Sequence, residues 1–179
     1  MKIAIFGGSF DPPHIGHEKI VQEALKKLDI DKIILVPTFL NPLKERFFAP
    51  ANKRKEWLEK IFSDSKKVEI SEFEIEKNRA VATYETVKHF KERLNPSIIY
   101  LIIGSDNYKN FHKWQRYEEL LNEVVPIIAT RDNDKIDSDL KKLDINVNIS
   151  SSKLRENLDL KYIPKIIRKE VEKFYGKEN

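Results

Sequence analysis

Two histidines close to the N-terminus are the first candidates for chemistry. His14 and His17 are three positions apart, in a stretch that reads Gly-Gly-Ser-Phe-Asp-Pro-Pro-His-Ile-Gly-His, residues 7–17. At that spacing, two side chains in the first turn of a helix lie on neighbouring parts of one face, and Gly16 between them leaves the face free of another side chain. The two imidazoles would therefore face one pocket at the start of the helix.

The glycines at the start of this stretch indicate what that pocket could bind. Gly7 and Gly8 allow the backbone to pass close to a ligand. Backbone N–H groups and a helix N-terminus present positive partial charge, which suits phosphate. The stretch matches neither the dinucleotide fingerprint, because Ser9 stands at its second glycine, nor the P-loop pattern.

Three interpretations of the histidine pair compete. A zinc pair has little support, because no third ligand is evident and the chain has no cysteine. Structural histidines would be the ordinary interpretation of an isolated pair. The glycine-rich setting favours contacts to phosphate.

A second stretch near the other end of the chain has a similar character. Residues 149–155 read Ile-Ser-Ser-Ser-Lys-Leu-Arg and again join a candidate strand to a short helix. Ser151 and Arg155, placed at the N-terminus of that helix, could hold phosphates, because a guanidinium fits phosphate oxygens well.

The elements that must position these residues follow from hydrophobic periodicity. Strands are expected at residues 2–6, 32–36, 67–71, 98–103, 124–130 and 145–149. Helices are expected at 15–28, 50–62, 83–94, in short pieces within 107–121, in a short segment ending at 155, and at 164–175. Residues 72–82 are expected to be irregular, 38–49 and 131–139 to be loops, and Pro126 to mark an edge strand or an irregular start.

Alternation of strands and helices predicts an α/β fold. We expect a Rossmann-like, doubly wound parallel sheet with right-handed crossovers and helices on both faces, in a single domain over residues 1–179. In such a sheet, ligands bind beyond the carboxyl ends of the strands. Both candidate stretches would lie at that edge.

Composition limits the class of protein. No apolar run approaches the length of a membrane-spanning helix, and a strand that begins directly at the N-terminus argues against a signal peptide. The absence of cysteine fits the reducing cytoplasm. The formal net charge of +4 arises from 33 basic residues interleaved with 29 acidic ones, which describes a solvated surface or a bias toward phosphate-bearing ligands.

Taken together, the two stretches identify a family resemblance. His14-Ile15-Gly16-His17 resembles the signature of the HxGH nucleotidyltransferase superfamily, and residues 149–155 resemble its C-terminal Ile-Ser-Ser-x-x-x-Arg signature. Within that superfamily the chain most resembles the bacterial nicotinate-nucleotide adenylyltransferases, over essentially its whole length. This likeness is carried by the opening stretch, by Asn41-Pro42-Leu43-Lys44, by Thr83-Tyr84-Glu85-Thr86, and by Gly104-Ser105-Asp106 followed by Trp114. Serine stands at positions 9 and 152, where threonine is common, and keeps the hydroxyl group.

The resemblance implies an activity. Members of that family transfer the adenylyl group of ATP to nicotinate mononucleotide, giving deamido-NAD and pyrophosphate in NAD biosynthesis, with Mg²⁺ accompanying the ATP. No protein side chain is expected to hold a metal, no nucleic acid or membrane partner is expected, and a homodimer remains open. A cytoplasmic location is expected.

The resemblance also implies roles for particular residues. It implies catalytic roles for His14, His17, Lys44 and Arg155. It implies ATP binding by Gly7, Gly8, Ser9, Phe10, Gly16, Gly104, Asp106, Ile149, Ser150 and Ser151. It implies binding of the nicotinate nucleotide by Asn41, Lys44, Thr83, Tyr84 and Trp114.

Several of these residues have plainer interpretations. Asp106 could cap a short helix instead of binding the adenosine ribose, and Trp114 could belong to the core instead of stacking on the nicotinate ring. Thr83 is most simply a helix N-cap, and the same helix start could offer N–H groups to the nicotinate carboxylate. The pair Phe47-Phe48 could be core, or part of a loop that orders with substrate. His89 and His112 are expected to be structural or at the surface.

Two other functions remain as alternatives. Pantetheine-phosphate adenylyltransferases resemble the chain at both signature ends, but they typically lack the second glycine, the Asp-Pro-Pro-His spelling and the segment from Gly104 to Trp114. A non-enzymatic nucleotide- or RNA-binding protein of the same fold would need a basic stripe, whereas the charge here is dispersed.

Overall fold

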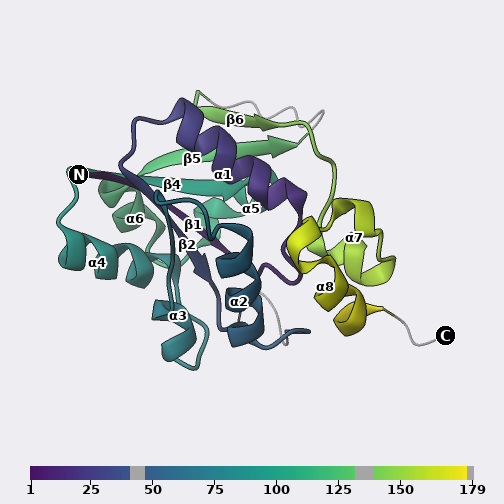
Figure 1. The fold of residues 1–179 in the computed structure, drawn as a ribbon. Coiled ribbons are helices and arrows are strands. Elements are labelled where there is room, and N and C mark those ends of the chain that lie inside the picture. Colours follow the sequence, from purple (N-terminus) through teal and green to yellow (C-terminus); the bar gives the residue numbers. More distant parts are fainter. Residues whose placement is uncertain (41–46, 132–138, 177–179) are drawn as a thin grey trace.

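A six-stranded parallel sheet forms the centre of the computed structural model, which describes residues 1–40, 47–131 and 139–176 (Figure 1). The strands are β1 (Lys2–Gly8), β2 (Lys32–Pro37), β3 (Val68–Ile70), β4 (Ile98–Gly104), β5 (Val125–Arg131) and β6 (Lys142–Ile145). Their order across the sheet is β3-β2-β1-β4-β5-β6. This is the doubly wound order with its reversal between β1 and β4, so the predicted Rossmann-like class is confirmed.

Eight α-helices within the described residues surround the sheet. They are α1 (Ile15–Lys27), α2 (Ala51–Ile61), α3 (Phe73–Glu76), α4 (Thr83–Leu94), α5 (Ser105–Tyr108), α6 (Tyr117–Glu123), α7 (Ser151–Glu156) and α8 (Arg168–Tyr175). Single turns of 3-10 helix cover Phe111–Lys113, Leu160–Tyr162 and Lys165–Ile167. No helix in this part of the chain is both long and apolar enough to cross a membrane.

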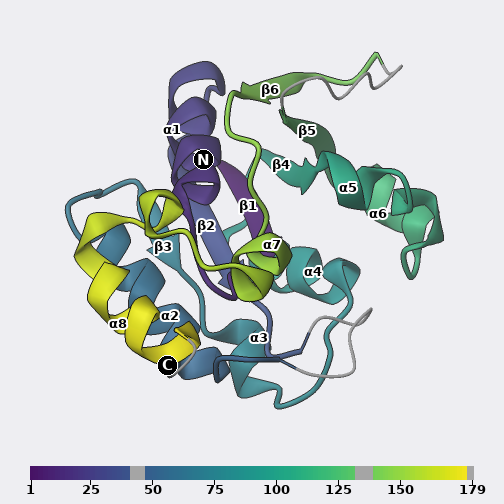
Figure 2. The same ribbon diagram turned by 90° about the vertical axis from the view of Figure 1, so that its right-hand side faces the viewer.

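The central strands β1, β2 and β4 are apolar over most of their length, as expected in a parallel sheet whose two faces are both covered by helices (Figure 2). On one face, Ala4 and Phe6 of β1 pack with residues of α1 and α2. On the other face, Ile3 and Ile5 pack with residues of α4 and α6. A third cluster fills the space between α2 and the C-terminal helices and includes Trp57, Ile149 and Val171. The predicted helices on both faces are therefore confirmed.

Two expectations about the last strands are wrong. β5 is not an edge strand, because it lies between β4 and β6, and its proline is tolerated because pairing with β6 starts only at Ile128, two residues after Pro126. The last strand covers residues 142–145 instead of 145–149. Ile145 pairs with Arg131, the last described residue of β5, so within the described ranges no strand residue is paired with the segment beyond Ile145.

Two smaller differences concern the segment before α4. Residues 72–82 are not wholly irregular, because they contain α3, where Ile75 and Glu74 are buried and the Ser71 hydroxyl accepts a hydrogen bond from the Phe73 N–H (3.2 Å). Thr83 is not the N-cap of α4: Ala82 occupies that position and Thr83 is the first helical residue.

Candidate active site

The candidate site lies where the strand order reverses. β1 pairs with β2 on one side and β4 on the other, so the segments that follow β1 and β4 diverge to opposite faces of the sheet. Doubly wound proteins bind their ligands at such a point, beyond the carboxyl ends of the strands. Gly7, Gly8 and Ser9 lie at the end of β1, and Gly104 ends β4.

The two histidines stack on each other at this edge. Their ring centroids are 3.7 Å apart with 23° between the planes. His14 is the N-cap of α1 and His17 lies in its first turn. Phe10 packs edge-on beneath His17 at 4.9 Å, with a backbone φ of 49° and a side chain only 1% exposed. Because its ring is buried, any contact of Phe10 with ATP falls to its backbone.

Two glycines make this aromatic layer possible. A Cβ atom on Gly16 would lie 2.9 Å from the His14 ring, and one on Gly8 would lie 3.1 Å from the Phe10 ring. Both distances are too short for a rigid neighbour. Gly16 lets the His14 ring fold over the helix start, and its expected contact with ATP stays a prediction.

Hydrogen bonding fixes the tautomer of His17. The backbone N–H of His14 donates to Nδ1 of His17 at 3.2 Å, so Nδ1 carries no hydrogen and Nε2–H is the remaining donor. Part of the His17 surface is accessible, yet the ring is enclosed by Phe6, Phe10 and His14. Desolvation, and then the charges of His14 and Arg131, lower the pKa of His17 well below its usual value. His17 is therefore a neutral hydrogen-bond donor at neutral pH.

His14 is neutral for the same main reason. Burial, followed by the charge of Arg131, lowers its pKa to about 3. Its Nδ1 atom is buried and has no hydrogen-bond partner among the described residues. A phosphate oxygen approaching this ring would meet an imidazole that its surroundings have kept uncharged.

Replacing His14 with glutamine is expected to reduce the amount by which the free energy of unfolding falls between pH 7 and pH 5. The pKa of folded His14 is about 3, against 6.5 ordinarily, so the unfolded chain binds the extra proton and stability falls as pH drops through this window. One such group costs about 2 kcal/mol between pH 6.5 and pH 5. Urea unfolding at pH 7 and pH 5 should show that the wild-type chain loses about this much more than the variant.

Other titrating groups are present in both the wild-type chain and the variant, so their contributions to the pH dependence of stability cancel in the comparison. Glu74, whose pKa is raised to about 7 by burial, contributes the opposite trend, but it is present in both proteins. Equal losses in wild type and variant would contradict a neutral His14.

The second signature stretch meets the first. Ser151 donates from its hydroxyl group to the carbonyl of Pro12 at 2.9 Å, and a Cβ on Gly16 would contact Ile149 at 3.5 Å. Ser150 is the N-cap of α7, where its hydroxyl accepts from the Lys153 N–H at 3.2 Å. The N-termini of α1 and α7 therefore lie side by side, as Figure 1 shows for the start of α1 and the C-terminal helices.

Arg155 reaches this junction from an unexpected position. It lies in the last turn of α7, not at its N-terminus, so the expectation about its place was wrong. Its side chain runs back along the helix, donates to the carbonyl of Asp11 and to the Ser152 hydroxyl (3.1 Å), and covers the Phe48 ring at 4.7 Å. The guanidinium thus still arrives beside the stretch that carries the histidines.

Arg131 is a further candidate that sequence reasoning placed in a charged loop. It ends β5, forms an ion pair with Asp106 at 3.0 Å, and is near enough to lower the pKa of both histidines. Its place directly after the expected strand 124–130 is the signal that could have identified it. Asp106 is the second residue of α5 and Gly104 is the N-cap, so the capping interpretation of Asp106 is wrong.

Arg54 was also missed, because it lies in a helix rich in charged residues. It is 1% exposed and donates to four backbone carbonyls, those of Ala49 (2.9 Å), Ser9, Thr38 (2.7 Å) and Phe39 (3.1 Å). These carbonyls come from the segments that follow β1 and β2. Arg54 therefore joins the two segments at the carboxyl edge of the sheet.

The candidates for the second substrate lie around the start of α4. Thr83 and Tyr84 begin that helix, and the guanidinium of Arg116 stacks on the Tyr84 ring at 4.0 Å. Trp114 is partly buried and packs edge-on against Phe111 at 5.0 Å, which leaves its contact with nicotinate a prediction. Asn41 and Lys44 lie outside the described residues.

The phenylalanine pair is not part of the core. Phe47 is 40% exposed and Phe48 49% exposed, so the core interpretation is wrong. Ordering of this segment on substrate stays a prediction.

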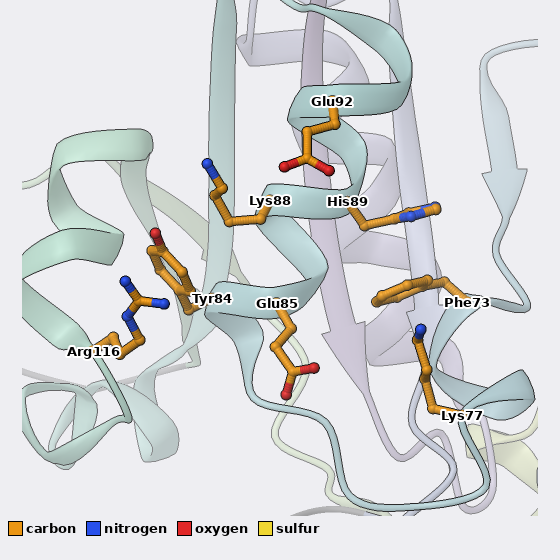
Figure 3. A pocket seen from close by; sticks show the side chains of 8 residues that line it. All are labelled: Phe73, Lys77, Tyr84, Glu85, Lys88, His89, Glu92 and Arg116. Atoms are coloured by element: carbon orange, nitrogen blue, oxygen red, sulfur yellow. The ribbon is translucent and has the colours of Figure 1, made fainter.

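A pocket lies along the outer side of α4, and neither His14 nor His17 lines it (Figure 3). Arg116 and Tyr84 stack at one end, and Phe73 and His89 stack at the other with ring centroids 4.0 Å apart. Glu85, Lys88, Glu92 and Lys77 complete the lining. Among its described lining residues, Tyr84 is the only predicted site residue. His89 is thus a packed histidine, as expected, and His112 is exposed.

Comparisons with known proteins agree with this geometry. Residues 5–157 match the family model described as cytidylyltransferase-like. A Campylobacter fetus protein named "Probable nicotinate-nucleotide adenylyltransferase" is 51% identical over 179 residues, covering 100% of this chain and 99% of its own length. A Sulfurimonas denitrificans protein of the same name is 50% identical over 178 residues, covering 99% and 96%. The structure of Plasmodium falciparum nicotinic acid mononucleotide adenylyltransferase complexed with NaAD superposes with a TM-score of 0.78 at 26% identity, covering 98% of this chain and 96% of that one.

Proposed function

Because the chain belongs to the nicotinate-nucleotide adenylyltransferase family within the cytidylyltransferase-like proteins, we propose that it transfers the adenylyl group of ATP to nicotinate mononucleotide. The products are nicotinate adenine dinucleotide and pyrophosphate, so the enzyme acts in NAD biosynthesis. The mononucleotide's phosphate oxygen forms a bond to the α-phosphorus of ATP as the bond to the pyrophosphate oxygen breaks. No covalent bond to the protein is needed.

The observation that carries this proposal is the contact between the two signature stretches. The bond from Ser151 to the Pro12 carbonyl (2.9 Å) brings His14, His17 and Arg155 to one place at the carboxyl edge of the sheet. Transfer at phosphorus depends on in-line positioning and on stabilising charge on the equatorial oxygens. A neutral N–H donor on His17 and the cationic fork of Arg155 supply these interactions without taking up the transferred group.

We propose that Mg²⁺ enters with the ATP. No cluster of three or more acidic or histidine side chains suited to a metal occurs among the described residues. Mg²⁺ commonly binds through substrate phosphates and water with few protein ligands, which fits a site whose donors are N–H groups and cations. The metal would neutralise charge on the leaving pyrophosphate, and the residues named above would orient the triphosphate.

We assign selection of the second substrate to the start of α4 and to Trp114. The first N–H groups of this 12-residue helix lack partners within the helix, and such a terminus favours the nicotinate carboxylate over an amide. The flat face of Trp114 suits the pyridine ring. Asn41 and Lys44 are assigned to the same substrate by family resemblance alone.

One assay tests the proposed function directly. The purified chain is incubated with MgATP and one of three acceptors: nicotinate mononucleotide, nicotinamide mononucleotide or phosphopantetheine. Release of pyrophosphate with the first acceptor is expected. No release with that compound refutes the proposal, and turnover with phosphopantetheine alone favours the pantetheine-phosphate alternative. Equal rates with acid and amide refute the role given to α4.

Replacing Trp114 with alanine is expected to weaken mononucleotide binding. Loss of one stacked ring costs about 1–2 kcal/mol, so KM for the mononucleotide should rise roughly 5–30-fold while KM for ATP changes less than about twofold. Steady-state kinetics with each substrate varied in turn measures both values. Tyr100→Phe on β4 is a matched control away from the site. If KM for ATP rises more than KM for the mononucleotide, Trp114 contacts ATP and its assignment to nicotinate is wrong.

We further propose a cytoplasmic location, which the absence of cysteine supports. We also propose that residues 1–179 form a single domain. Whether it forms a homodimer is tested by light scattering during size-exclusion chromatography.

A further inference from the structure

A tyrosine of the last helix contacts the histidine-bearing stretch across the whole length of the sequence. The hydroxyl of Tyr175, in the final turn of α8, donates to Oδ1 of Asp11, 164 positions earlier. The Asp11 side chain is only 3% exposed. Nothing in the two signature motifs points to Tyr175.

The Asp11 carboxylate holds a neighbouring segment in place. Oδ1 accepts from the backbone N–H of Ala49 at 3.0 Å, and Oδ2 accepts from that of Phe48 at 2.8 Å. The carboxylate thus receives three donors from two distant parts of the chain. Charged acceptors in such arrangements make stronger hydrogen bonds than neutral ones.

α8 offers a firm base for this tyrosine. Glu170 accepts from Lys60 (2.6 Å), Lys53 (2.9 Å) and the indole N–H of Trp57 (3.2 Å), all on α2. Val171, one residue further, is fully buried in the cluster between α2 and the C-terminal helices. The helix that carries Tyr175 is therefore fixed to α2 before it reaches Asp11.

Arg155 contacts the Asp11 backbone and the Phe48 side chain, and the Asp11 carboxylate links these two residues. Its guanidinium donates to the Asp11 carbonyl and covers the Phe48 ring at 4.7 Å. Asp11 and Phe48 are joined by the bond from the Phe48 N–H to Oδ2 (2.8 Å). If Asp11 or Phe48 shifts, the guanidinium loses its support.

We propose that Tyr175 is a positioning residue for Arg155: by bonding to Asp11, it holds Asp11 and Phe48 in the arrangement that aims the guanidinium at the phosphates of ATP. This inference rests on the proposed function only in taking Arg155 as a phosphate ligand. It makes the C-terminal helix α8 part of the ATP site without any contact between α8 and ATP.

The test is a double-mutant cycle on ATP affinity. Tyr175→Phe keeps the ring and its packing, so the protein should fold, which a thermal melt checks. Its Kd for MgATP, measured calorimetrically without an acceptor, should rise about three- to tenfold, and its Kd for nicotinate mononucleotide should stay within about twofold. In an Arg155→Met background the same change should alter the Kd for MgATP by less than about 1.5-fold.

A matched control and the opposing outcomes complete the design. Tyr162→Phe removes a hydroxyl from the 3-10 turn Leu160–Tyr162 and should leave the Kd for MgATP unchanged. An unchanged Kd in Tyr175→Phe overturns the proposal, because a purely structural tyrosine would lower the melting temperature alone. The same rise in Kd in the wild-type and Arg155→Met backgrounds also overturns it, because the effect would then not act through Arg155. If the wild type binds MgATP but makes no dinucleotide, the proposed function fails while the cycle still tests Tyr175.

Discussion

His17→Ala is expected to lower kcat by about two to three orders of magnitude while changing KM for nicotinate mononucleotide by less than about threefold. The reason lies in the His17 tautomer. With Nδ1 occupied by the His14 N–H (3.2 Å), only Nε2–H is available to a developing charge. A donor placed for the transition state affects kcat rather than substrate binding. Steady-state kinetics with both substrates measures the two constants.

Two further variants separate the role of His17 from general disturbance of the site. His17→Gln supplies a neutral N–H donor, so it should recover part of the activity that alanine loses; a proton-transfer role would leave glutamine as inactive as alanine. His89→Ala, which removes a histidine packed on Phe73 at 4.0 Å, should keep kcat near the wild-type value. If His17→Ala raises KM and leaves kcat unchanged, His17 binds the ground state and the assignment is wrong.

Much of the fold was accessible from the sequence because the apolar residues carry clear periods. α1 and α4 begin at the expected residues, and the strands of the sheet centre are continuous apolar runs. The wrong predictions concern β5 and β6, whose positions depend on how the strands pair with each other. The position of β6 follows from its pairing with residues 128–131 of β5, and Pro126 is acceptable in an interior strand because this pairing starts only at Ile128. Neither fact is a property of the local segment.

The candidate site divides in the same way. The signature stretches are local, so their residues could be named in advance, and they do meet in space at the bond from Ser151 to Pro12. The residues that hold this meeting place together were not named. Tyr175 acts across 164 positions, and Arg54 resembles the solvated lysines and glutamates around it in α2. Their roles depend on which segments the fold brings beside them.

Arg54 is the residue whose loss should harm the fold most. Its guanidinium replaces the water that four backbone carbonyls would otherwise need. Burial lowers the pKa of Arg54, and the nearby charge of Asp11 opposes that shift. Removing a buried charged donor leaves its hydrogen-bond acceptors unpaired and commonly costs about 3–5 kcal/mol. The segments after β1 and β2 would then lose their common anchor.

Arg54→Met, which keeps most of the side-chain volume, is therefore expected to lower the free energy of unfolding by about 3–5 kcal/mol in urea titrations. Arg54→Lys should recover only part of this loss, because one ammonium group cannot reach four carbonyls in the geometry of the guanidinium. Arg79→Met removes an arginine whose side chain is 52% exposed and paired with Glu85, and should lower the free energy of unfolding far less than Arg54→Met does. Similar losses in Arg54→Met and Arg79→Met would mean that the buried guanidinium does not hold the two segments together.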